Sequence, residues 1–194
     1  MGASVTQLRA KIAVLEQLTS LFHSPSYLRA VALAQTADTL IITGVGKSGI
    51  AAQKIAATLR STGAVAHYLN PTDAAHGDLG MVRPGDAVFF LSNSGGSAEL
   101  TPIVAFCAAR GIPTVAITQQ IHSPLARAAD IVLRQPCVGE GDPLGMAPMS
   151  SVIAQLAIGD GIAAELMTCQ GFTADQFRAC HPGGALGQIA EAAE

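Results

Sequence analysis

Two glycine-rich segments of the sequence carry residue types that bind phosphate groups. The first is TGVGKSG at residues 43–49, which offers Gly46, Lys47 and Ser48 as binding residues. Its glycines fit the dinucleotide-binding pattern G-x-G-x-x-G, and its GKS matches the end of the P-loop pattern G-x-x-x-x-G-K-[ST]. The P-loop pattern also needs a glycine at position 41, where this sequence has Ile41. The spacing alone therefore leaves three ligands open: a nucleoside triphosphate, a dinucleotide or a smaller phosphorylated compound.

The second segment, SNSGGS at residues 92–97, has the composition of a phosphate cradle without a positive charge. It combines two glycines with three hydroxyls and one amide, from Ser92, Ser94, Ser97 and Asn93. Glycines let backbone N–H groups approach an anion, hydroxyls donate to its oxygens, and the start of the following helix adds a favourable dipole. The alternative is an ordinary Ser/Gly turn in which Ser97 caps the helix. The position of the segment after a strand favours the cradle.

Neighbouring residues argue against both nucleotides. A dinucleotide site needs an acidic residue near the end of the second strand. That strand ends at Leu69, and Asp73 comes late, in a loop that contains proline. An ATPase needs a Walker-B aspartate after an apolar strand, and the sequence does not show one. A lysine in a glycine turn, together with a second phosphate-binding loop, favours a small phosphorylated substrate.

Short apolar runs of strand length alternate with helical patterns along most of the chain. The strands are predicted at residues 39–43, 65–69, 87–91, 114–118 and 131–133. The helices are predicted at residues 8–21, 26–35, 48–61, 97–109, 123–129 and 147–167. Continuous apolar strands that alternate with helices indicate a parallel sheet covered on both faces, a three-layer α/β sandwich. In such a sheet the ligand binds outside the carboxyl ends of the strands, where both glycine-rich segments fall.

The composition suggests an oligomer. Charged residues make up 13% of the 194 residues, against about 25% in a typical soluble domain, so much of the surface is expected to be buried between subunits. The helix at 147–167 is apolar around nearly its whole circumference and is expected to be buried on all sides, with a subunit interface as one neighbour. We expect one domain, with N-terminal helices at 1–38, a parallel α/β core at 39–135, and a catalytic loop and C-terminal helices at 136–194.

Charge and cysteine usage limit the partners and the compartment. A net charge of −3 without a Lys/Arg cluster argues against a nucleic-acid partner, and no uninterrupted apolar run is long enough to predict a membrane span. The four cysteines lack C-x-x-C spacing, so they are expected to be reduced core thiols of a cytoplasmic protein and not metal ligands.

Seven segments in one order resemble the sugar isomerase (SIS) domain of D-arabinose 5-phosphate isomerases. They are GVGKSG, STGAVAHYLNPTDAAHGDLGMV, SNSGGSAE, ARAAD, GEGDPLGMAPMSS, GFTADQF and HPGGALG, between residues 41 and 187. AAHGDLGM and HPGGALG are the segments most specific to this branch. The sequence departs from the family by having Gly96 where relatives carry Glu, and by ending soon after HPGGALG, which suggests a stand-alone form without CBS domains.

The resemblance implies a flavodoxin-like SIS fold and an aldose–ketose isomerase that converts D-arabinose 5-phosphate to D-ribulose 5-phosphate through an enediol. It implies no metal and no organic cofactor, a cytoplasmic homotetramer, and a product used for Kdo in lipopolysaccharide or in sugar-alcohol metabolism. Two alternatives remain: another SIS phosphosugar isomerase, and a non-catalytic module that binds a phosphosugar.

An enediol mechanism needs an acid/base group, donors to the enediolate oxygens and a group that moves hydroxyl protons. We assign the main acid/base role to His181 because an imidazole titrates near neutral pH. Glu99 or Glu140 is expected to share the proton transfer, Lys47 to donate to a sugar or phosphate oxygen, and His76 to aid ring opening or binding. Each of these five residues could instead have no catalytic role and be an ordinary helix-end residue or a solvated loop residue. In the wider SIS group the C-terminal histidine often enters a neighbouring subunit's site.

Overall fold

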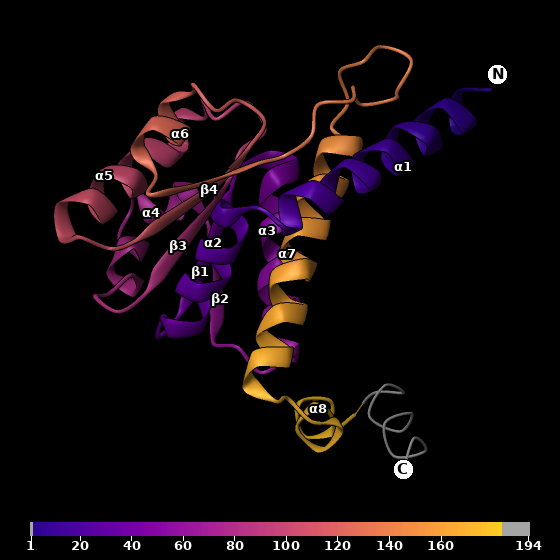
Figure 1. Cartoon of the computed structure of the whole chain (residues 1–194). Coiled ribbons are helices and arrows are strands. Elements are labelled where there is room, and N and C mark those ends of the chain that lie inside the picture. Colours follow the sequence, from indigo (N-terminus) through magenta and orange to yellow (C-terminus); the bar gives the residue numbers. More distant parts are fainter. Residues whose placement is uncertain (1, 184–194) are drawn as a thin grey trace.

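The computed structural model describes residues 2–183, in which five strands form one parallel sheet (Figure 1). They are β1 (Leu40–Gly44), β2 (Ala66–Leu69), β3 (Ala87–Leu91), β4 (Thr114–Thr118) and β5 (Ile131–Arg134). Their order is β2-β1-β3-β4-β5, and every neighbouring pair is parallel. The predicted five-stranded parallel sheet is confirmed. This is the flavodoxin-like order, in which β2 lies on one side of β1 and the later strands on the other, so the strand order reverses between β1 and β3.

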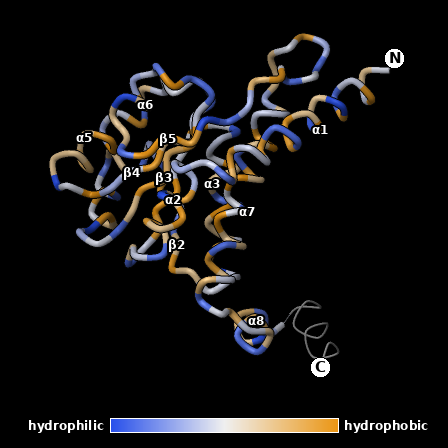
Figure 2. Tube along the Cα trace, viewed as in Figure 1, coloured by the Kyte–Doolittle hydropathy of each residue, from blue (hydrophilic) through white to orange (hydrophobic). Residues whose placement is uncertain are grey.

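Helices cover both faces of the sheet, which confirms the three-layer α/β sandwich. One face carries α1 (Ala3–Phe22), α2 (Pro25–Thr36), α3 (Gly46–Ser61) and α7 (Ser150–Gln170). The other carries α4 (Pro71–Ala74), α5 (Thr101–Arg110), α6 (Pro124–Ala128) and the 3-10 turn η2 (Ala98–Leu100). A second 3-10 turn, η1 (Asp78–Met81), precedes β3, and α8 (Ala174–Cys180) follows α7. The apolar residues of the strands separate these two layers (Figure 2).

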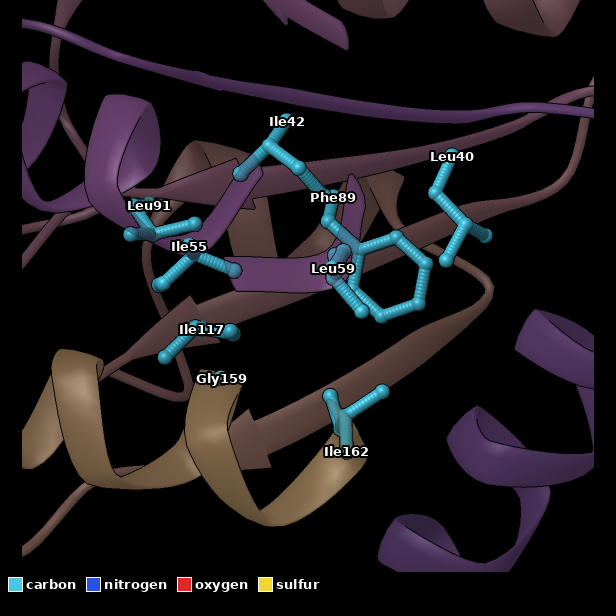
Figure 3. A pocket seen from close by; sticks show the side chains of 9 residues that line it. All are labelled: Leu40, Ile42, Ile55, Leu59, Phe89, Leu91, Ile117, Gly159 and Ile162. Carbon is cyan, nitrogen blue, oxygen red and sulfur yellow. The ribbon is translucent and has the colours of Figure 1, made fainter. Parts of the chain in front are cut away.

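Alternate residues of each strand point to the two helical layers. In β1, Leu40 and Ile42 join the core under α3 and α7, whereas Ile41 joins the core under α5. In the first core, Gly159 of α7 lies against Ile55 of α3, so a side chain at residue 159 would overlap Ile55 (Figure 3). The void left there is only about 10 Å³ and is lined by apolar residues, so a water molecule there would lack hydrogen-bond partners. The close packing of α3, α7 and the sheet gives the site a rigid base.

The predicted helix at 97–109 is wrong at its start. The chain forms the 3-10 turn η2 first, and α5 begins at Thr101 with Pro102 in its first turn. A proline inside a helix lacks the N–H and clashes with the carbonyl four residues earlier, so a helix from 97 could not run through Pro102. As a result Glu99 lies in the 3-10 turn and not in the helix.

Helix α7 is not buried on all sides within the single chain, and its predicted burial with a subunit interface as one neighbour stays a prediction. Nine of its residues are buried, and it contacts α1, α2 and α3, but Asp160, Ala164 and Glu165 are exposed. The reason is that the helix lies on one layer of the sandwich and has neighbours on one side. By length and composition α7 is also apolar enough to cross a membrane, a test that helices packed in a protein core pass as well.

The cysteines do not form the predicted set of core thiols. Only Cys107 is buried, where burial and, less strongly, the Asp130 carboxylate raise the pKa of its thiol to about 11. Cys137, Cys169 and Cys180 are exposed. They lie in the loop after β5 and at the ends of α7 and α8, where apolar neighbours in the sequence do not imply burial.

Candidate active site

The turn between β1 and α3 is shaped by three glycines at the carboxyl edge of the sheet. A Cβ on Gly44 would lie 2.9 Å from the Leu91 carbonyl oxygen, and one on Gly49 would lie 2.7 Å from the Gly44 carbonyl oxygen. Gly46 has φ +59° and open space around it. Two glycines therefore let the helix pack closely on the strands, and the third supplies the left-handed turn. This division of roles resembles that of the glycines in dinucleotide-binding turns.

The turn places Gly46, Lys47 and Ser48 in the first turn of α3. The helix thus begins at Gly46, two residues before the predicted start at residue 48. The first intrahelical bond runs from the Gly49 N–H to the Val45 carbonyl at 3.3 Å, so the N–H groups of residues 46–48 lack intrahelical acceptors. Lys47 is exposed, and the Ser48 hydroxyl lies 3.1 Å from Nε2 of Gln155 on α7. Free N–H groups, the helix dipole and a lysine together favour an anion.

The serine loop after β3 holds itself in shape through its own hydroxyls. Ser92 is 3% exposed, and its Oγ lies 3.0 Å from Ser97 Oγ and accepts the Gly95 N–H at 3.1 Å. Ser94 is exposed and accepts the Gly96 N–H at 3.3 Å. Ser92 therefore has a structural task in the loop, whereas the Ser94 hydroxyl is open to a ligand.

Gly95 is the residue on which this loop geometry depends. Its φ is +63°, and a Cβ there would overlap the Ser123 hydroxyl. Gly95→Ala is therefore expected to lower the free energy of unfolding by at least about 2 kcal/mol, which corresponds to a Tm lower by roughly 4–8 °C. Thermal unfolding measures this. Gly96→Ala is the matched control, because no atom lies closer than 3.8 Å to its Cβ; equal shifts in the two variants would contradict the argument.

Asn93 is held at three points. Its carbonyl accepts the Thr118 hydroxyl and the Gln119 N–H, each at 3.2 Å. Its side-chain Oδ1 accepts a hydrogen bond from Nε2 of Gln135, which follows β5. The loop after β3 is thus fastened to the ends of β4 and β5, and the Asn93 amide has one fixed orientation.

Glu140 caps the N-terminus of α7. Its Oε2 accepts the N–H groups of Met149 at 2.7 Å and Ser151 at 3.0 Å, and its carbonyl accepts the Ser150 hydroxyl at 3.1 Å. Asn93, Glu140 and the first residues of α7 line a hollow of about 260 Å³. The residues that line this hollow do not include Lys47, Glu99 or the serines of the serine loop, Ser92, Ser94 and Ser97. Ser97 lines a second hollow of about 280 Å³ beside α6.

Glu99 and His76 lie at the same edge of the sheet. Both are exposed. Helix α4, which follows β2, contacts η2, so the loop that carries His76 and the turn that carries Glu99 belong to neighbouring segments. The His76 backbone N–H donates to the Asp73 carbonyl at 2.9 Å, and its side chain faces outward from the chain.

His181 does not join the other predicted residues. Its Nδ1 lies 2.8 Å from the Phe177 carbonyl, and its ring stacks on Phe177 with centroids 4.0 Å apart. Glu140 caps one end of α7, and α8 leaves the other end (Figure 1); 21 residues of helix span about 31 Å. Phe172, between the two helices, lies against Gly63, just before β2 and so at the amino edge of the sheet. Residues of HPGGALG beyond 183 lie outside the described part of the chain.

Two glutamines near the loops were not predicted. Gln155 and Gln135 are both fully buried and reach Ser48 and Asn93 respectively. Gln155 could have been found from the sequence, because it is a lone glutamine in the apolar run at 147–167 that forms most of α7. Gln135, in the mixed segment RQPC, gave no signal.

Comparison with known proteins supports a common origin with phosphosugar enzymes. The model of the SIS domain family matches residues 33–164. Arabinose 5-phosphate isomerase KdsD of Shigella flexneri is 46% identical over 149 residues, which are 77% of this chain and 45% of that protein. The chain thus spans about half the length of the relatives it matches.

Two solved structures share the fold. The Escherichia coli protein c3406, solved in complex with arabinose 5-phosphate, has 34% identity and a TM-score of 0.83 over 93% of this chain and 94% of its own. A Listeria monocytogenes protein has 26% identity and a TM-score of 0.89 over 93% of this chain and 95% of its own.

Proposed function

The chain belongs to the SIS domain family, and from this membership we propose that it is an isomerase that interconverts D-arabinose 5-phosphate and D-ribulose 5-phosphate. The observation that carries the proposal is the 34% identity, over 93% of the chain, to a protein solved with arabinose 5-phosphate. The hydrogen-bond donors at the start of α3, after β1, and in the serine loop, after β3, suit the phosphate of such a sugar. The reaction is proposed to take place in the cytoplasm.

In the proposed reaction a base removes the proton on C2 of the aldose and an acid delivers a proton to C1, while the O2 hydroxyl proton moves to O1. The phosphate binds to the start of α3 and the serine loop, far enough from the reacting carbons to orient them. Lys47 donates to an enediolate or phosphate oxygen, His181 is the main acid/base group, and Glu99 or Glu140 shares the transfer. His76 assists ring opening or binding.

We propose that a second copy of the chain supplies His181. This residue lies beyond a helix of about 31 Å from the loops of its own chain. Helix α1 supports an assembly, because Val5, Leu8, Ile12 and Leu15 are all at least 44% exposed and their 3-4-3 spacing forms an apolar stripe on one side of the helix. The assembly is proposed to be a homo-oligomer, such as a tetramer, in which each site combines loops from one subunit with the C-terminal segment of another.

An assay of ketose formation from arabinose 5-phosphate tests the function. Formation of ribulose 5-phosphate without added metal is the expected result. A chain that binds the sugar without converting it would be a phosphosugar-binding module, and conversion of a hexulose 6-phosphate in its place would indicate another isomerase of the family.

Ser94 tests the phosphate site. Ser94→Ala is expected to raise the KM for arabinose 5-phosphate by roughly 10- to 100-fold, because it removes a donor to a charged group worth about 1.5–3 kcal/mol. Steady-state kinetics measure the change. Ser61→Ala at the far end of α3 is the matched control, since its hydroxyl donates to the Thr58 carbonyl of the same helix. If KM is the same in both variants, the phosphate binds elsewhere.

A further inference from the structure

Gln155 and Gln135 share an unusual environment at the carboxyl edge of the sheet. Both are fully buried. Nε2 of Gln155 lies 3.1 Å from Ser48 Oγ, and Nε2 of Gln135 donates to Asn93 Oδ1. Within residues 2–183, Oε1 of each glutamine has no hydrogen-bond partner. Each amide is therefore tied to one residue of the candidate phosphate site, Gln155 to Ser48 in the first turn of α3 and Gln135 to Asn93 in the serine loop.

This arrangement lowers the stability of the protein. A buried acceptor without a partner keeps the full desolvation penalty of its polar atom, whereas an apolar side chain of the same length has no such penalty. Gln155 lies in α7 between apolar residues, so a methionine would suit the position better by packing alone. Polar residues that lower stability in this way are typical of functional sites.

In both hydrogen bonds the glutamine is the donor, which leaves the donor groups of Ser48 and Asn93 free to bind an anion. An amide nitrogen only donates, so Ser48 Oγ and Asn93 Oδ1 must both accept. The Ser48 hydroxyl proton and the Asn93 NH2 group are then left to donate elsewhere. Ser48 stands beside the free N–H groups of α3, and Asn93 lines the hollow at the start of α7.

We propose that Gln155 and Gln135 are positioning residues that hold Ser48 and Asn93 as hydrogen-bond donors to the oxygens of the bound phosphosugar. The proposal deepens the proposed function and rests on its phosphate site. Neither glutamine touches the substrate, because Gln155 acts through Ser48 and Gln135 acts through Asn93.

A double-mutant cycle tests the Gln155 part. Gln155→Met is expected to weaken the binding of inorganic phosphate and to raise the KM for arabinose 5-phosphate, each by about three- to tenfold, with kcat changed less than twofold. The Tm is expected to stay level or to rise, because the unpartnered acceptor is removed. In a Ser48→Ala background, Gln155→Met should have no further effect on phosphate binding or on KM, since the residue through which it acts is gone. Asn93→Ala and Gln135→Met form the second cycle.

Thr114→Val is the matched control. Thr114 is buried at the amino end of β4 and donates to Asp130 Oδ2 at 2.7 Å, so this variant should lower the Tm and leave phosphate affinity unchanged. The glutamine proposal is overturned if Gln155→Met leaves phosphate affinity and KM unchanged, whatever its effect on the Tm, or if its effect adds fully to that of Ser48→Ala.

Failure of the proposed function can be distinguished from failure of this inference. A wild-type chain that binds phosphate but does not isomerise the sugar contradicts the function alone, and the cycles are then judged on phosphate affinity. A chain that isomerises the sugar but gives additive cycles contradicts the roles of the glutamines alone. A chain that neither binds phosphate nor isomerises the sugar contradicts both, and for a chain that isomerises the sugar without measurable phosphate affinity the cycles are judged on KM.

Discussion

His181→Asn is expected to lower kcat by about 10²–10⁴, the usual contribution of a positioned acid/base group. Asparagine keeps a polar side chain of similar reach but cannot take up and release a proton near neutral pH, so KM should change little. The pH profile of kcat should also lose one limb. Steady-state kinetics with arabinose 5-phosphate across pH measure both effects.

His23→Asn is a close control for the His181 variant. His23 ends α1 as His181 ends α8, and each ring Nδ1 lies 2.8 Å from the carbonyl four residues earlier. The two substitutions therefore make the same local change at a helix end. Only the His181 variant should lose activity.

A mixture of two inactive variants tests whether the site is shared. If His181 acts in the site of a second subunit, mixing His181→Asn with Glu99→Gln should restore part of the activity, because some sites then combine an intact Glu99 with an intact His181. A mixture that stays inactive while the subunits exchange would show that both residues act from one chain. A His181→Asn enzyme that exchanges the C2 hydrogen of the sugar with solvent at the wild-type rate would move the base to Glu99 or Glu140.

The sheet was predictable because its strands are buried on both faces. The runs around Ile42, Phe89 and Val115 are apolar except for threonines at their ends, and parallel strands in a covered sheet require such runs. The layers were predictable for the same reason. The start of α5 was not, because the helical pattern of 97–109 outweighed Pro102, whose ring excludes a continuous helix.

The loops of the site were more predictable than its assembly. Gly46 and Ser94 could be predicted as binding residues from the sequence, because glycine and serine at a helix start favour anion binding for local reasons. The separation of His181 from Glu140 depends on the length and direction of α7, which a motif does not encode. The roles of Gln155 and Gln135 depend on contacts over 107 and 42 residues of sequence, and such long-range contacts leave no local pattern.

Glu140 has two tasks to separate, because it caps α7 and is also a candidate for proton transfer. Glu140→Gln keeps an oxygen that can accept the Met149 and Ser151 N–H groups and loses only the charge, worth about 0.3–1 kcal/mol at a helix start. Glu140→Ala loses both and should cost about 1–2 kcal/mol, which lowers the Tm by roughly 2–8 °C. Thermal unfolding should therefore rank the variants wild type, Gln and Ala in falling stability.

The kinetics should not follow that ranking. If Glu140 moves a proton, both substitutions should lower kcat by about 10²–10⁴, since neither side chain can act as a base. If it is only a cap, Gln should retain most of the activity and Ala should lose activity in proportion to its instability. Asp142→Asn is the matched control, because Asp142 accepts the Leu144 and Ala147 N–H groups in the same loop and should affect stability alone. Nearly wild-type kcat in Glu140→Gln would remove Glu140 from the chemistry and leave Glu99 as the carboxylate that works with His181.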